Sequence, residues 1–269
     1  MKKKGSKKIV IIVLIILVVL TITQLFVLGA MGGIGPLGFI RNNRIAKHPG
    51  NSTDYDFSTI EQAENNLLTG KNICVLGSSV AYGSASQENS IGEYLAARFG
   101  ANITKEAVGG TTLVDKGNSY IHRMLNNIPQ DAQFDLFICQ LSTNDATKKL
   151  PLGQISESME LSDFDTSTVT GAMEYIICYA RQTWGCPVVF FTGAYYSSAE
   201  YDAMVTQLLK LEEKWGIGVL NLWTDEAFNA ISEQERSLYM NDKIHPTKAG
   251  YRDWWCPEME RQLLQFLAQ

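Results

Sequence analysis

The sequence predicts a three-layer α/β/α sandwich built on a mainly parallel five-stranded sheet and preceded by one transmembrane helix. Between residues 71 and 267, short apolar runs alternate with helical segments five times, which is typical of βα units around a parallel sheet. Residues 9–31 contain no charged side chain and consist mostly of Ile, Val and Leu, enough to cross a bilayer core of about 30 Å. The remainder has an ordinary globular composition, since the whole chain is 45% hydrophobic and 19% charged.

The N-terminal charges predict the orientation of this helix. Five lysines precede it, at positions Lys2, Lys3, Lys4, Lys7 and Lys8. Such a cluster favours retention of the N-terminus in the cytoplasm. We therefore expect a cytoplasmic tail at 1–8, a signal anchor at 9–31 and an extracellular remainder. A cleaved signal peptide, which would yield a secreted protein, is the alternative, although its apolar region usually spans only about 7–15 residues.

Charge and cysteine usage exclude several classes of partner and cofactor. The net charge is −5, and subtracting the five N-terminal lysines leaves −10 for the rest of the chain. An acidic body argues against a nucleic-acid partner. None of the five cysteines forms a C-x-x-C pair, so we expect neither a metal nor a cofactor. One disulfide among Cys178, Cys186 and Cys256 would be compatible with an extracellular domain. The sequence carries no signal for the oligomeric state.

The remaining elements follow from apolar runs, caps and breakers. We expect a linker at 32–56 and the catalytic domain at 57–269. Strands are predicted at 73–76, 101–108, 134–141, 187–191 and 218–222, and helices at 57–70, 90–99, 119–127, 167–184, 199–215, part of 225–238, and 251–267. Residues 146–165 lack a clear period, and a loop of this length is a candidate lid.

Polar residues follow the first three predicted strands. Ser79 lies just after the first strand, Gly110 after the second and Asn144 after the third. In a parallel sheet these positions share the carboxyl edge, where ligands bind. Near the C-terminus, His245 stands in a loop three residues after Asp242, whereas the other histidines lie in the linker and in a predicted helix. On its own, each feature is also compatible with an ordinary turn or cap.

Together these residues suit acyl transfer to serine. A serine hydroxyl needs an adjacent base, and His245 could remove the Ser79 proton while Asp242 orients the imidazole. The N–H groups of Ser79 and Gly110 and the amide of Asn144 could stabilise the oxyanion. Gly109 is the alternative to Gly110 in this role.

Four blocks in this order resemble those of the SGNH (GDSL-type) hydrolases. They are Gly77-Ser78-Ser79 with Gly83, the glycine block around Gly110, Ser142-Thr143-Asn144-Asp145, and Asp242 to His245 followed by Pro246. The resemblance covers about residues 71–267 and implies a flavodoxin-like sandwich and metal-free carboxylester hydrolysis. Ser78 replaces the usual Asp of the first block, and Ser142 replaces the usual Gly of the third. The α/β-hydrolase elbow does not fit, because Ala81 occupies its second glycine position.

We therefore expect an extracellular, membrane-anchored serine esterase that removes short acyl groups, such as acetyl, from a small-molecule or glycan ester. Tyr195 and Tyr196 are candidate substrate-binding residues, as are Trp254 and Trp255, although aromatic residues more often pack in cores. Three alternatives remain open: an O-acyltransferase to a cell-surface glycan with the same triad, a lipid esterase, and a catalytically silent binding module on the same fold.

Overall fold

The computed structural model describes residues 3–32, 35 and 37–269. Lys2 of the predicted tail and Gly33, Ile34 and Pro36 of the predicted linker lie outside the described residues. The chain divides after His48 into two compact units, which are described separately below.

The first unit contains the apolar helix expected near the N-terminus. Helix α1 spans Lys3–Gly32, and its segment Lys8–Val27 has a mean hydropathy of 3.2 with no part of it buried. Its length and composition are compatible with a signal anchor or a signal sequence. A second helix, α2 at Gly38–Ala46, lies within the predicted linker and has Arg44 in its last turn.

The second unit is built on a five-stranded sheet in which every strand pair is parallel, as the sequence predicts. The strands are β1 (Asn72–Gly77), β2 (Asn102–Ala107), β3 (Leu136–Gln140), β4 (Val188–Phe191) and β5 (Gly218–Leu220). Their order is β2-β1-β3-β4-β5, and Leu76 of β1 is aligned with Cys139 of β3. The order changes direction at β1, so the loops after β1, β2 and β3 surround the point where α/β sheets usually bind ligands.

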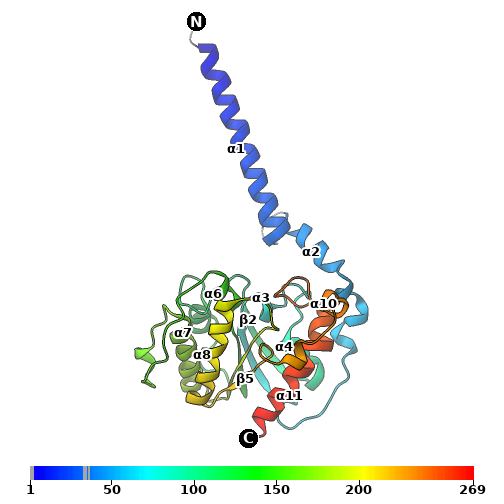
Figure 1. The fold of residues 1–269 in the computed structure, drawn as a ribbon, viewed down its shortest axis with the longest axis vertical. Coiled ribbons are helices and arrows are strands. Elements are labelled where there is room, and N and C mark those ends of the chain that lie inside the picture. The colour runs from blue at the N-terminus through cyan, green and yellow to red at the C-terminus, as the bar shows by residue number, and fades with distance from the viewer. Residues whose placement is uncertain (1–2, 33–34, 36) are drawn as a thin grey trace. The chain divides into compact units, whose positions relative to one another are not determined.

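Helices cover both faces of this sheet and complete the three layers (Figure 1). One face carries α5 (Tyr120–Asn127), α7 (Val169–Trp184) and α8 (Ala199–Trp215), and the other carries α4 (Ile91–Phe99) and α11 (Cys256–Leu267). Shorter elements are α3 (Ser79–Tyr82), α6 (Thr143–Thr147), α9 (Glu226–Asn229), α10 (Glu233–Tyr239), η1 (Pro49–Asn51), η2 (Thr53–Tyr55), η3 (Phe57–Thr59), η4 (Leu161–Asp163) and the π-helical η5 (Gly250–Trp255).

Burial on both faces explains why the sequences of the central strands are continuous apolar runs. All residues of β3 and β4 are buried, which is the usual state of strands in a parallel sheet covered on both sides. The five cysteines are also buried, and all of them are free. The disulfide considered among Cys178, Cys186 and Cys256 is therefore absent, and these thiols pack as small apolar side chains.

The segment before β1 differs from the prediction in two ways. Residues 57–70 form the single 3-10 turn η3, an extended stretch and a turn rather than a helix. Tertiary hydrogen bonds explain this, because Ala63 N–H donates to Arg98 O (2.8 Å) and Gly70 N–H donates to Phe99 O (3.2 Å). In addition, the compact unit begins at Pro49, so part of the segment expected as linker packs into it.

Asn51 shows how that early segment contributes. Its side chain is buried, donating to Ala85 O (2.8 Å) and accepting from Lys248 N–H (2.8 Å). It thus connects the loop after Ser79 to the loop after His245.

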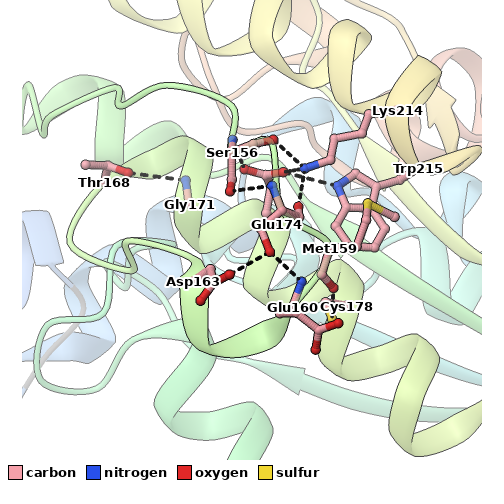
Figure 2. A network of polar contacts seen from close by, with 11 residues as sticks. Ser156, Met159, Glu160, Asp163, Thr168, Gly171, Glu174, Cys178, Lys214 and Trp215 are labelled. Carbon is pink, nitrogen blue, oxygen red and sulfur yellow. Dashed lines mark hydrogen bonds and ion pairs between the residues drawn. The ribbon is translucent and has the colours of Figure 1, made fainter.

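The long segment after α6 is fixed to the helices by a buried ion pair (Figure 2). Lys214 Nζ on α8 lies 2.5 Å from Glu174 Oε1 on α7 and donates to the carbonyl oxygens of Ser156 and Ser158, both at 2.7 Å. Ser156 N–H donates to the other oxygen of Glu174 (2.9 Å). Because the Glu174 side chain is fully buried, this anchoring favours a fixed strap over a mobile lid.

Candidate active site

Ser79 stands at the start of α3, directly after β1. The turn between them depends on Gly77, since a Cβ there would lie 2.3 Å from the Cβ of Ala81. No other residue permits so close an approach of strand and helix. Ser78 is fully buried, whereas Ser79 is partly exposed. The turn therefore presents the Ser79 hydroxyl at the carboxyl edge of the sheet.

The loop carrying His245 is closed by a short antiparallel bridge between Met240 and Pro246. Inside it, Asn241 N–H donates to His245 O (2.9 Å). The Asp242 carboxylate accepts from the N–H groups of Ile244 and His245, both at 2.9 Å. These hydrogen bonds fix the backbone on both sides of the His245 imidazole.

Ser79, His245 and Asp242 form one continuous hydrogen-bonded chain. Ser79 Oγ lies 2.8 Å from His245 Nε2, and His245 Nδ1 lies 2.9 Å from both carboxylate oxygens of Asp242. A serine, a base within hydrogen-bond reach and a carboxylate that orients the base are the parts needed to activate a serine nucleophile. The structure thus brings together the three residues predicted as catalytic.

The environment of Asp242 favours its ionised form. Burial by itself would raise the pKa of this carboxyl. Other interactions outweigh burial and hold the pKa of Asp242 well below its usual value. They are the hydrogen bond and charge interaction with His245 and the hydrogen bonds from the backbone N–H groups of Ile244 and His245. Asp242 is therefore a carboxylate at neutral pH, suited to holding a proton on His245 Nδ1.

Asn144 and Gly110 occupy the neighbouring loops, after β3 and β2. The Asn144 amide donates one hydrogen bond to Thr111 O (3.0 Å), which orients the side chain and leaves its second hydrogen available. Among the described residues, the N–H groups of Ser79 and Gly110 have no protein acceptor. Lys148 Nζ donates to Gly110 O (2.8 Å) and holds this loop. The loops after β1, β2 and β3 therefore each carry one candidate oxyanion donor.

The two glycines of this loop differ in their conformation and surroundings. Gly110 has φ +81° and open space around its Cβ position, so backbone conformation explains the glycine. A Cβ on Gly109 would lie 3.7 Å from the Ser79 Cβ, so Gly109 is the one that directly faces the serine. The role predicted for the Gly110 N–H stays a prediction.

Gln140 supports the Ser79 turn and was not predicted as a site residue. It is the last residue of β3 and is buried. Its Oε1 accepts from the N–H groups of Ser78 (2.9 Å) and Ala81 (2.8 Å), and its Nε2 donates to Ser78 Oγ (3.1 Å). Ser78, which differs from the Asp expected from the resemblance noted above, is thus a partner of Gln140. The sequence signal that could have identified Gln140 is its position as a polar residue at the end of an apolar strand.

Arg123 is a second buried support. Only 1% of it is exposed, and its guanidinium donates to Gly77 O (2.8 Å), Glu106 Oε1 (2.9 Å) and Thr111 Oγ1 (3.0 Å). It therefore links the end of β1 to the loop that carries Gly110. Asp145 complements it by accepting from the N–H groups of Leu113 (2.9 Å) and Val114 (3.1 Å).

The aromatic candidates separate into two groups. Trp254 and Trp255 are buried in the core, where Trp254 stacks on Phe228. Tyr195 is 52% exposed, and Tyr196 is partly buried, which raises its pKa to about 12. Both tyrosines line a hollow that Asp242 also lines. In the described part of the chain, no group of three or more His, Cys, Asp or Glu side chains could hold a metal ion.

The fold agrees with a comparison to protein families. The chain belongs to the GDSL-like lipase/acylhydrolase family, whose sequence profile matches residues 75–252. This family implies esterase or lipase activity in general. No match is found among curated proteins.

Solved structures share the fold at low sequence identity. A protein from Lactobacillus plantarum is 20% identical, with a TM-score of 0.60 over 74% of this chain and 97% of its own. An acetylxylan esterase from Geobacillus stearothermophilus is 12% identical, with a TM-score of 0.53 over 76% and 97%. A candidate GDSL-like lipase from Bacteroides ovatus is 14% identical, with a TM-score of 0.52 over 74% and 98%.

Proposed function

We propose that this protein is a membrane-anchored serine esterase whose catalytic domain, residues 49–269, lies outside the cell and removes short acyl groups, such as acetyl, from a polysaccharide. The observation that carries the proposal is the hydrogen-bonded chain from Ser79 through His245 to Asp242. Family membership supports ester hydrolysis, and the fold shared with an acetylxylan esterase supports an acetylated glycan as the first substrate to test.

The reaction would begin at Ser79. Its Oγ attacks the ester carbonyl carbon while His245 Nε2 takes the hydroxyl proton, and Asp242 stabilises the imidazolium. The negative charge on the carbonyl oxygen is met by the Ser79 and Gly110 N–H groups and by the Asn144 amide. As the C–O bond breaks, His245 returns the proton to the leaving alcohol, and Ser79 is left acylated.

Water completes the cycle in the same geometry. His245 removes a proton from a water molecule, which attacks the acyl carbon, and the collapse of the second tetrahedral intermediate returns the proton to Ser79 Oγ. The carboxylic acid then leaves. If a glycan hydroxyl takes the place of water, the same intermediate transfers the acyl group.

Substitution of the nucleophile tests this proposal. In the full-length protein in detergent, we expect Ser79→Ala to lower kcat for p-nitrophenyl acetate by about 10⁴-fold or more. Asp242→Asn should cost about 10³–10⁴-fold, because it would favour the wrong histidine tautomer. Ser58→Ala, at an exposed position in η3, is the matched control and should behave as the wild type.

The outcomes separate the competing functions. Full activity of Ser79→Ala would exclude the proposed mechanism. A folded wild type with no hydrolysis of acetate or butyrate esters would favour a silent binding module. Transfer of acetyl to an added glycan in preference to water would identify an acyltransferase.

A further inference from the structure

A second feature extends the candidate site along the sheet edge towards β5. Tyr195 follows β4, and Trp223 follows β5, so both lie beyond Asn144 in the order β3-β4-β5. Loops after parallel strands share one edge. Two hollows occupy this region, and Tyr195 lines both.

The first hollow adjoins the catalytic chain of hydrogen bonds. It has a volume of about 380 Å³, with Asp242 and Lys243 in its lining together with Tyr195 and Tyr196. Lys243 Nζ lies 5.4 Å from the centre of the Tyr196 ring, a distance at which a cation is attracted to an aromatic face. Asp242 is two hydrogen bonds away from Ser79 Oγ. The hollow therefore lies at the Asp242 end of this chain of hydrogen bonds, with the His245 imidazole between it and Ser79.

The second hollow shares Tyr195 with the first. It has a volume of about 480 Å³ and includes Trp223, Thr224 and Glu226 in its lining. Both volumes fall within the range of about 300–1,000 Å³ that small-molecule sites occupy. An exposed aromatic residue thus lines two spaces, each large enough for part of a ligand.

The Tyr195 ring is held in place before any ligand binds. Tyr195 N–H donates to Asn229 Oδ1 (2.9 Å), and the Asn229 amide in turn donates to Leu222 O (2.7 Å). The ring also packs against Trp223 with centroids 5.0 Å apart. Such preorganisation lowers the entropic cost of binding to the ring.

The lining favours a glycan over a lipid chain. Glu233, Arg236 and Lys243 line the first hollow, and Asp202 and Glu226 line the second. Burying an acyl chain against these groups would remove their hydration without replacing it. Sugar hydroxyls can hydrogen-bond to the charged groups, while the apolar face of a sugar ring packs on a tyrosine.

We propose that the two hollows form one glycan-binding groove with Tyr195 as its central platform, so that the enzyme prefers oligosaccharide esters to esters of isolated sugars. This inference rests on the proposed esterase function. Each sugar bound in the groove adds binding energy that a minimal ester cannot provide. The value of kcat/KM should therefore rise with the length of the oligosaccharide.

The test compares Tyr195 variants on substrates of increasing length. The full-length protein in detergent is assayed with p-nitrophenyl acetate and with acetylated xylo-, chito- and peptidoglycan oligosaccharides of one to six sugars, by acetate release. For the glycan that the wild type prefers, we expect Tyr195→Ala to lower the ratio of kcat/KM for the hexamer over p-nitrophenyl acetate by about tenfold, mainly through KM. Tyr195→Trp should restore the ratio because it retains a ring.

A matched control removes another tyrosine. Tyr175 on α7 stacks with Tyr179 and takes no part in either hollow, so Tyr175→Ala should keep the wild-type ratio. The groove would be disproved if kcat/KM did not rise with length for any of the three glycans. It would also be disproved if Tyr195→Ala changed kcat/KM by the same factor for all substrates. Either result is distinct from failure of the esterase proposal, which Ser79→Ala decides with p-nitrophenyl acetate alone.

Discussion

A single buried amide, that of Gln140, holds the turn that carries the candidate nucleophile. It accepts from the backbone on both sides of Ser79, at Ser78 and Ala81, and it donates to the Ser78 hydroxyl. Neither of these accepted hydrogen bonds involves the Ser79 N–H, which has no protein acceptor among the described residues. We infer that Gln140 positions the nucleophile and one oxyanion donor together.

Substitution of Gln140 should therefore affect the chemical step more than binding. Gln140→Leu would leave two buried N–H groups without an acceptor, at a cost of about 1–3 kcal/mol each in the free energy of unfolding. We expect kcat to fall by about 10–100-fold with little change in KM, measured with p-nitrophenyl acetate. Gln140→Glu keeps an acceptor oxygen and should recover most of kcat. Equal losses in both variants would contradict the positioning role.

The contrast between Ser79 and Gln140 shows what residue-level prediction can achieve. Ser79, Asn144 and His245 stand in local patterns at the ends of predicted elements, so the sequence was sufficient to select them. Gln140 acts across the pairing of β1 with β3, and no local pattern encodes that neighbour relation. Buried supports such as Arg123 escape prediction for the same reason.

At the scale of elements, the boundaries of strands and long helices follow from local patterns, whereas extended segments that depend on tertiary partners do not. The helix predicted at 90–99 begins with a capping box, in which Ser90 N–H donates to Glu93 Oε2 (3.0 Å). Residues 57–70 contain good helix formers. The hydrogen bonds to Arg98 and Phe99 nevertheless contribute more stabilising free energy than the local propensity of a short helix provides. The order of the strands had no local signal at all.

The strap at residues 146–165 gives a prediction about stability. Lys214→Met would leave the fully buried Glu174 without its cation, and removing one member of a buried pair costs about 3–5 kcal/mol. We expect this loss in urea unfolding, with faster thermolysin cleavage between residues 152 and 165. Lys210→Met, an exposed position on the same helix, should change neither. A strap that is cut equally fast in the wild type and in Lys214→Met would instead indicate a mobile lid.

At the scale of the whole molecule, the N-terminal lysines and the apolar helix together favour one arrangement in the membrane. A cluster of positive charges before a span favours its retention in the cytoplasm. The unit that follows would then face an exterior where free thiols are prone to oxidation. All five cysteines are buried, which protects them without any disulfide.

Those buried thiols make the topology measurable by cysteine labelling, because the native cysteines should not react in the folded protein. We expect Gln130→Cys, at an exposed loop position, to react with a membrane-impermeant maleimide in intact cells. Ser6→Cys, before the apolar segment Lys8–Val27 of α1, should react only after the cells are permeabilised. The opposite pattern would place the catalytic domain in the cytoplasm, where an extracellular polysaccharide is out of reach. A mature protein that has lost residue 6 altogether would show that the helix is a cleaved signal sequence, and the esterase would then be secreted and not anchored.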